Sequence, residues 1–84
     1  MKPKANPSLE VIASDGGFVI HDSASGVVHY LNETAAIVFA LCDGELDAND
    51  IAELMKRSYR LEAAPVADVE TAIAELLRLG VVDV

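Results

Sequence analysis

The hydrophobic pattern of this chain changes its period once, near Asn32. Before Asn32, short runs rich in β-branched and aromatic residues alternate with stretches of Gly, Ser and Asp, as in strands joined by turns. The runs occupy residues 9–13, 18–21 and 27–31. The first break contains Asp-Gly-Gly at residues 15–17, where glycine supplies the positive φ angles of a tight hairpin. We therefore expect an antiparallel meander of three strands.

A helical pattern begins at Asn32, whose short polar side chain suits a helix cap. Residues 34–42 carry no charge and are mostly apolar, so the helix that they predict must be buried on most of its sides. Gly44 follows and can end this helix as a left-handed cap.

Two further helices are predicted. Asp47 and Asp50 have the spacing of a cap and the third helical position, and they open the second helix. The third helix is expected over residues 65–79, with Gly80 at its end and residues 81–82 as a short extended tail that packs beneath it. Because the strands cluster and the helices follow them, the fold class is α+β.

The length of 84 residues allows one small domain, because a single core usually serves about 50 to 200 residues. Residues 1–8 contain two prolines and no large apolar residue, so we expect them to form a flexible N-terminal tail. Residues 9–84 are then the single folded domain.

The charge narrows the choice of partners. The formal net charge is −8, and no segment forms a basic stripe. Proteins that neutralise phosphates need clustered Lys and Arg, so nucleic acid and anionic membranes are disfavoured as partners, and a protein or peptide is favoured. The longest uncharged stretch, residues 23–32, is much shorter than the roughly 20 apolar residues that span a bilayer.

The compartment is expected to be the cytoplasm. Lys2 and Lys4 are not followed by the apolar run of a secretory signal. The single cysteine, Cys42, has no partner for an internal disulfide.

No constellation of residues predicts an active site. Cys42 lies in the most apolar helix with no cation near it in sequence, which favours a small core residue over a nucleophile. His21 and His29 lack the spacing of a metal site. The acidic residues 45–50 are explained by a turn and a helix start, and the glycines at 16–17 do not precede the helix of a phosphate-binding loop. We therefore predict that the chain is not an enzyme and binds no metal or cofactor.

The third predicted strand, residues 27–31, is an edge of the meander and carries neither a charge nor a proline. Such an edge exposes unpaired backbone groups and aggregates unless it is protected or used. One interpretation is a docking edge on which an extended peptide adds as a further strand. The other is an edge covered by the protein's own tail or by a second copy of the chain, and the pattern alone does not choose between them.

Several motifs along the chain resemble those of the PqqD-like proteins. They are residues 31–36 (Leu-Asn-Glu-Thr-Ala-Ala), 43–44 (Asp-Gly), 47–51 (Asp-Ala-Asn-Asp-Ile), 68–69 (Asp-Val) and 80–81 (Gly-Val), together with Leu76. The resemblance extends from about Ile12 to Val82. Among the departures, Phe39 stands where the family often has Trp, and Ala72 stands where a Phe is common and leaves space on the third helix.

The resemblance implies a winged-helix-like domain that recognises the leader of a ribosomally made precursor peptide and presents it to a modifying enzyme. In such proteins the leader adds beside the third strand and lies in a groove that the third helix borders. The residues that this implies for peptide binding are Val27, Val28, His29, Tyr30, Val69, Ala72, Ile73, Leu76 and Leu79. The implied enzyme partner is a radical SAM enzyme, a cyclase or a leader peptidase. A homodimer is a further expected assembly, on the separate ground that a second copy can cover the open edge.

The period of a strand adds one expectation about the side chains of this edge. His29 should lie on the face of Leu31, with Val28 and Tyr30 on the opposite face. We also expect basic residues of the leader or of the enzyme to assist encounter with the acidic surface.

Two other function classes stay open at this point. Winged helices often bind DNA, but the cations gather at Lys56, Arg57 and Arg60 rather than along a recognition face. The open edge could also serve a dimerisation module that recognises no peptide. Fold alone does not decide among these classes.

Overall fold

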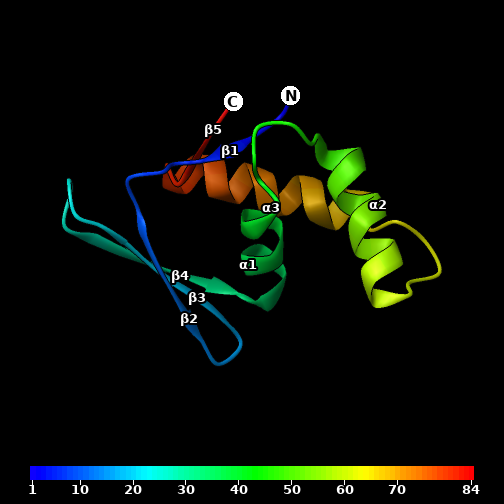
Figure 1. Ribbon diagram of the computed structural model, residues 1–84, viewed down its shortest axis with the longest axis horizontal. Coiled ribbons are helices and arrows are strands. Elements are labelled where there is room, and N and C mark those ends of the chain that lie inside the picture. The colour runs from blue at the N-terminus through cyan, green and yellow to red at the C-terminus, as the bar shows by residue number, and fades with distance from the viewer.

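The computed structural model describes residues 1–84 and contains a three-stranded sheet, a two-stranded sheet and three helices. The elements in chain order are β1 (Lys4–Ala5), β2 (Glu10–Ser14), β3 (Gly17–Asp22), β4 (Val27–Asn32), α1 (Glu33–Ala40), α2 (Ala48–Tyr59), α3 (Val66–Leu79) and β5 (Val82–Asp83). The larger sheet is antiparallel in the order β2-β3-β4, so the meander and the α+β order predicted from the sequence are confirmed. All three helices lie to one side of this sheet, with α1 crossing α3 (Figure 1).

The two hairpins of the meander turn where the sequence predicts. Ser14 pairs with Gly17 across a two-residue turn in which Gly16 has a φ of 79°. In the second turn the side chain of Asp22 accepts a hydrogen bond from the backbone N–H of Ala24 at 3.1 Å. Because a turn of fixed length sets the strand register, these two turns determine which side chains share a face of the sheet.

Two of the predicted helix caps are confirmed by their hydrogen bonds. The Asn32 side chain accepts from the backbone N–H of Ala35 at 2.9 Å and begins α1. At α2, Asp47 accepts from the Asp50 N–H at 2.8 Å, and Asp50 accepts from the Asp47 N–H at 3.2 Å. This reciprocal pair satisfies two backbone donors that a helix start leaves free.

The third helix begins one residue later than predicted. Pro65 occupies the cap position and α3 starts at Val66, without a side-chain cap. At its other end Gly80 is left-handed, with a φ of 76°, as expected.

Gly44 does not cap α1, which corrects the prediction. The helix ends at Ala40, with Leu41 as a right-handed cap. Gly44 does have a positive φ of 87°, but its N–H donates to the carbonyl of Pro3 at 3.0 Å. The backbone that leaves α1 turns early because it pairs with the N-terminal segment instead of continuing as a helix.

The prediction of a flexible tail is wrong for residues 3–6. Strand β1 pairs with β5, with Lys4 opposite Asp83 and Ala5 opposite Val82. The Ala5 N–H also donates to the Cys42 carbonyl at 2.8 Å, and Pro3 is fully buried. The segment is held by backbone hydrogen bonds rather than by large apolar side chains, so its hydrophobic pattern does not predict this order. Figure 1 shows the two ends of the chain near each other beside this small sheet.

The core lies between the sheet and the helices and contains 14 buried apolar residues. Ile20 in the sheet, Val38 in α1 and Ile51 in α2 are fully buried. Phe18 and Phe39 meet edge to face with ring centroids 6.3 Å apart. The short tail predicted after α3 also packs here, since Val81 and Val82 are both buried. No helix combines the length and the apolar character that crossing a membrane would require.

Candidate functional site

Strand β4 is a free edge of the sheet. It pairs with β3 on one side and with no strand on the other. A Cβ added to Gly17 would collide with the carbonyl oxygen of Leu31, so this carbonyl points toward β3. In an antiparallel pair, opposed residues alternate between exchanging hydrogen bonds and exchanging none. The backbone groups of Val28 and Tyr30 therefore point away from β3, toward the open edge.

The side chains of β4 alternate as the sequence predicts. His29 is half-buried and Leu31 is buried, on the face that covers the core. Val28 and Tyr30, 43% and 78% exposed, lie on the opposite face. A strand added to this edge would therefore direct every second side chain toward the helices.

A groove lies between the end of β4, the start of α1 and the outer face of α3. Its pocket has a volume of about 430 Å³. The residues that line it are Asn32, Thr34, Ala35, Asp68, Thr71, Ala72 and Glu75. Most of these side chains are polar, and we name this surface the acidic groove because Asp68 and Glu75 are its charged residues. The Glu75 carboxylate accepts from the Nε–H of Arg78 at 2.9 Å, and this hydrogen bond lowers the pKa of Glu75.

Helix α3 divides the residues that the sequence analysis assigned to peptide binding. Val69, Ile73 and Leu76 are buried in the core, with exposures of 0%, 5% and 0%, so they do not line the groove. Ala72 does line it and is half-buried. Leu79 is also half-buried, but it packs against the core.

The sequence does not single out the lining residues Asp68, Thr71 and Glu75, because the periodic signal of α3 is its apolar stripe. On an amphipathic helix that stripe faces the core. The groove face is the one that contains residues 68, 71, 72 and 75, and its small and polar side chains gave no apolar signal.

A larger pocket, of about 560 Å³, lies on another face of α1 and does not include β4. Its α1 residues include Ala36, Ile37 and Ala40, whereas the acidic groove uses Thr34 and Ala35. The turns of one helix therefore border two separate surfaces.

The structure does not bring the cysteine, the histidines and the carboxylates together as a reactive site. The Cys42 thiol is buried and donates to the Val38 carbonyl at 3.1 Å. Burial and then the Asp43 carboxylate raise the pKa of Cys42 to about 11, so the thiol is protonated at neutral pH. His21 lies 3.9 Å from the Glu10 carboxylate on the exposed sheet face. No three His, Cys, Asp or Glu side chains lie together as ligands for a metal ion.

Comparisons with known proteins agree on the architecture. The chain matches no curated protein. A solved structure described as "Lasso peptide synthetase B1 complexed with the leader peptide" has the same fold, with a TM-score of 0.76, 24% sequence identity and coverage of 100% of both chains. The family model for coenzyme PQQ synthesis protein D (PqqD) matches residues 17–82, from the start of β3 to β5. On this match over most of its length, the chain belongs to the PqqD family.

Proposed function

We propose that this protein binds the leader segment of a ribosomally made precursor peptide as an added strand on β4 and presents it to a modifying enzyme. The observation that carries the proposal is the free edge of β4, where the backbone groups of Val28 and Tyr30 point outward beside the acidic groove. Membership of the PqqD family supports it. So does the structural likeness to a protein described as complexed with a leader peptide.

Recognition divides between backbone and side chains. Pairing with the backbone of Val28 and Tyr30 gives affinity that depends little on the leader sequence, as in other cases of strand addition. Selectivity arises where alternate leader side chains enter the acidic groove. The space above Ala72 accepts a compact apolar side chain, and Asp68 favours a basic one.

The protein contributes no catalytic group of its own in this proposal. By holding the leader and the enzyme together, it makes their encounter intramolecular, with effective concentrations that reach about the millimolar range for short flexible links. A radical SAM enzyme, a cyclase and a leader peptidase are the receiving enzymes that the family suggests. A cytoplasmic location fits the single reduced thiol of Cys42.

DNA binding is a weaker candidate. The outer face of α3 presents Asp68 and Glu75, which would repel phosphates. The cations at Lys56, Arg57 and Arg60 belong to the end of α2. A homodimer formed edge to edge through β4 would compete with the leader, so it is distinguished by the experiment below.

The test is fluorescence anisotropy with the labelled leader from the short open reading frame nearest this gene. The wild type should bind with a Kd of about 1 µM or lower. Val28→Pro removes a backbone donor at the free edge and should weaken binding by about tenfold or more. Val28→Ala keeps that donor and should bind nearly as the wild type does.

Val11→Pro is the matched control on the other edge of the sheet. Val11 is 43% exposed, the same as Val28. It pairs with Ile20, whose hydrogen bonds go to His29 in β4, so the backbone groups of Val11 also point outward. This variant should bind the leader normally, while circular dichroism shows that all variants are folded.

Three outcomes would overturn the proposal. Loss of binding in Val11→Pro with normal binding in Val28→Pro would move the peptide to the β2 edge. Self-association of the wild type that Val28→Pro abolishes, without leader binding in either form, would indicate a dimerisation module. Absence of leader binding by the folded wild type, with the modifying enzyme present, would exclude leader recognition.

A further inference from the structure

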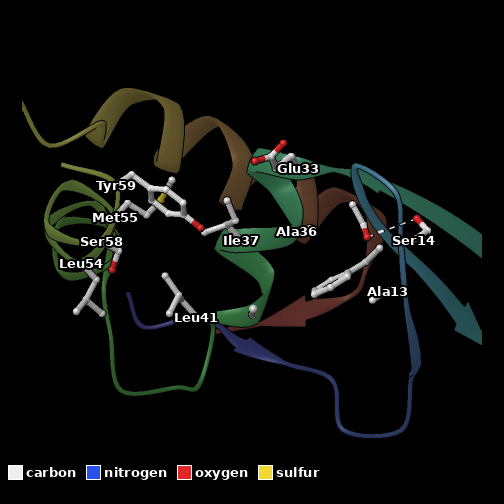
Figure 2. Close-up of a pocket in the computed structure, with 13 residues that line it drawn as sticks. Ala13, Ser14, Glu33, Ala36, Ile37, Leu41, Leu54, Met55, Ser58 and Tyr59 are labelled. Atoms are coloured by element: carbon white, nitrogen blue, oxygen red, sulfur yellow. Dashed lines mark hydrogen bonds between the residues drawn. The ribbon is translucent and has the colours of Figure 1, made fainter. Parts of the chain in front are cut away.

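The larger pocket lies between the β2–β3 hairpin, α1 and α2, on the side of the molecule where β2 is the edge strand. Nine of its 13 lining residues are hydrophobic. Phe18 comes from the hairpin, Ile37 from α1, Leu41 from the cap that ends α1, and Leu54 from α2. Figure 2 shows these helices with the ring of Tyr59 extending from α2 toward Ile37. We name this surface the apolar pocket.

Apolar area is also exposed at the end of α2, where Tyr59 lines the pocket. Tyr59 is 52% exposed, and Leu61, which follows the end of α2, is 40% exposed. Ile37 in α1, Leu41 at its cap and Leu54 in α2 are only half-buried, although both helices contribute to the core. Exposed apolar side chains beside an apolar concavity are typical of an interaction site in a small protein.

Cations flank the α2 wall of this pocket. Three of the six Lys and Arg residues of the chain are Lys56, Arg57 and Arg60. Helical spacing places Arg57 beside Leu54 and Lys56 beside Tyr59, each pair being three residues apart. We name Lys56 and Arg57, together with Arg60 at the cap that ends α2, the cationic rim.

None of the cations in the rim forms an ion pair within the chain. The two ion pairs of the structure are His21 with Glu10 and Arg78 with Glu75. This is notable in a protein with 14 acidic residues, since partners for Lys56 and Arg57 are abundant in the sequence. The one carboxylate in the pocket lining is Glu33, at the start of α1 and away from α2 (Figure 2).

We propose that the apolar pocket and the cationic rim bind an acidic segment of the modifying enzyme, with an apolar side chain of that segment as the anchor in the pocket. This inference rests on the proposed function, because it assigns the enzyme a surface separate from the leader site. The two surfaces lie on different faces of α1, so the leader and the enzyme bind at the same time. The two partners are distinguished by their charge. The acidic groove attracts basic segments of the leader, and the cationic rim attracts acidic segments of the enzyme.

A protein segment suits this pocket better than a small ligand does. The lining offers few polar groups that could orient a small molecule, and the Ser14 hydroxyl already donates to the Gly17 carbonyl at 3.4 Å. Small-molecule sites usually contain several convergent polar groups in an otherwise apolar cavity. A second copy of the chain is the alternative occupant, and the measurements below separate it from the enzyme.

The first measurement uses a synthetic helical peptide with Leu and Phe on one face and Glu on the others, followed by amide chemical shifts of the full chain. Residues of the apolar pocket, such as Phe18, Ile37 and Tyr59, should shift. A matched peptide with Lys in place of Glu should not shift them. Equal shifts with both peptides, or shifts confined to the acidic groove, would overturn the proposal.

The second measurement titrates the modifying enzyme encoded nearest this gene with the wild type and three variants of the chain. The double variant Lys56→Glu, Arg57→Glu should bind the enzyme about tenfold more weakly than the wild type. Lys2→Glu changes the charge in the same direction outside the pocket and should have little effect. Arg57→Gln is a milder variant that perturbs the end of α2 less, and it should weaken binding in the same direction.

Leader affinity, measured on the same forms, separates this proposal from the proposed function. Normal leader binding by all forms with weakened enzyme binding by the rim variants supports both. Equal enzyme binding by the wild type and the double variant, or no enzyme binding at all, overturns the docking surface and leaves leader binding standing. Failure of every form to bind the leader, with rim-dependent enzyme binding intact, overturns the proposed function alone. Rim-dependent self-association of the wild type would identify a second copy as the occupant and overturn the inference.

Discussion

The two edges of the larger sheet are alike in backbone and different in surroundings. Val28 in β4 and Val11 in β2 are equally exposed, and both direct their backbone groups outward. Beside β4 lies a groove with two carboxylates, whereas beside β2 lies an apolar pocket flanked by cations. An open edge therefore provides general affinity for an extended chain, and the neighbouring helix determines which chain it selects.

Helix α1 separates the acidic groove from the apolar pocket, because it is short and lies between them. Its eight residues present Thr34 and Ala35 to the acidic groove and Ala36 and Ile37 to the apolar pocket. No residue of α1 lines both surfaces. Variants on one side should therefore leave binding on the other side unchanged, which is a direct way to test the comparison.

The largest effect, on the free energy of unfolding, is expected in α3, because this helix packs against the helices that border both surfaces. Leu76 in α3 is fully buried, and α3 packs against both α1 and α2. Leu76→Ala should lower the free energy of unfolding by about 2 to 5 kcal/mol, through lost burial and a cavity. Denaturant unfolding measures this loss, and both binding activities should weaken together as the folded fraction falls.

Leu79→Ala is the control for this stability measurement. Leu79 is half-buried near the end of the same helix, so its loss should be clearly smaller. Equal losses in the two variants would contradict the assignment of Leu76 to the core face and reopen its role in peptide binding.

The local parts of the fold could be predicted from the sequence because each depends on few neighbouring residues. The caps at Asn32 and Asp47 require one side chain and a backbone N–H three residues away. The alternation of His29 and Tyr30 follows from the period of a strand once the strand is identified. The free edge of β4 follows from a meander that ends there.

The sequence-based predictions that were wrong or absent concern contacts between segments that lie far apart in the chain. Residues 3–6 are ordered by backbone bonds to Cys42 and Val81, which no local pattern reveals. The same pairing explains why Gly44 is not a helix cap. The apolar pocket was not predicted because it joins Ala13 to Tyr59 across the fold. On α3, the sequence pattern predicts an apolar stripe, but it does not indicate whether Val69 and Ile73 lie in a groove or in the core.

A large side chain at position 72 should change the affinity for the leader at the acidic groove without changing the affinity for the acidic peptide at the apolar pocket. Ala72→Phe places a ring in the acidic groove, so leader binding should change strongly, with a loss of about tenfold if the ring fills the space that a leader residue occupies. Binding of the acidic peptide at the apolar pocket should not change. Ala74→Phe, at an exposed position on another face of α3, is the matched control. Leader affinity that is unaffected by Ala72→Phe would place the peptide outside the groove.

A smaller effect is expected from the charge of the groove. If basic residues of the leader approach Asp68, then Asp68→Asn should reduce the association rate by roughly two- to threefold at low salt. The difference should vanish at about 1 M salt, where the screening length is only about 3 Å. Glu53→Gln removes the same charge from α2 and serves as the control. An association rate that does not respond to salt in the wild type would contradict electrostatic assistance altogether.

The smallest effect concerns the core between the two surfaces, where Cys42 should be insensitive to ligands on either side. The residue is 3% exposed, and the pKa of its thiol is raised from 9.0 to about 11, chiefly by burial. Thiol reagents at pH 7.5 should therefore react slowly, with or without leader or acidic peptide. Between pH 9 and 11 the folded state keeps a proton that the unfolded state releases, so stability should decline as pH rises through this range and be constant in this respect below it. Comparing unfolding of the wild type and Cys42→Ala at pH 7.5 and pH 10 isolates this contribution from the titration of Tyr and Lys. Rapid modification at pH 7.5, or a rate that changes when one ligand binds, would show that the core opens and that the two surfaces are coupled through it.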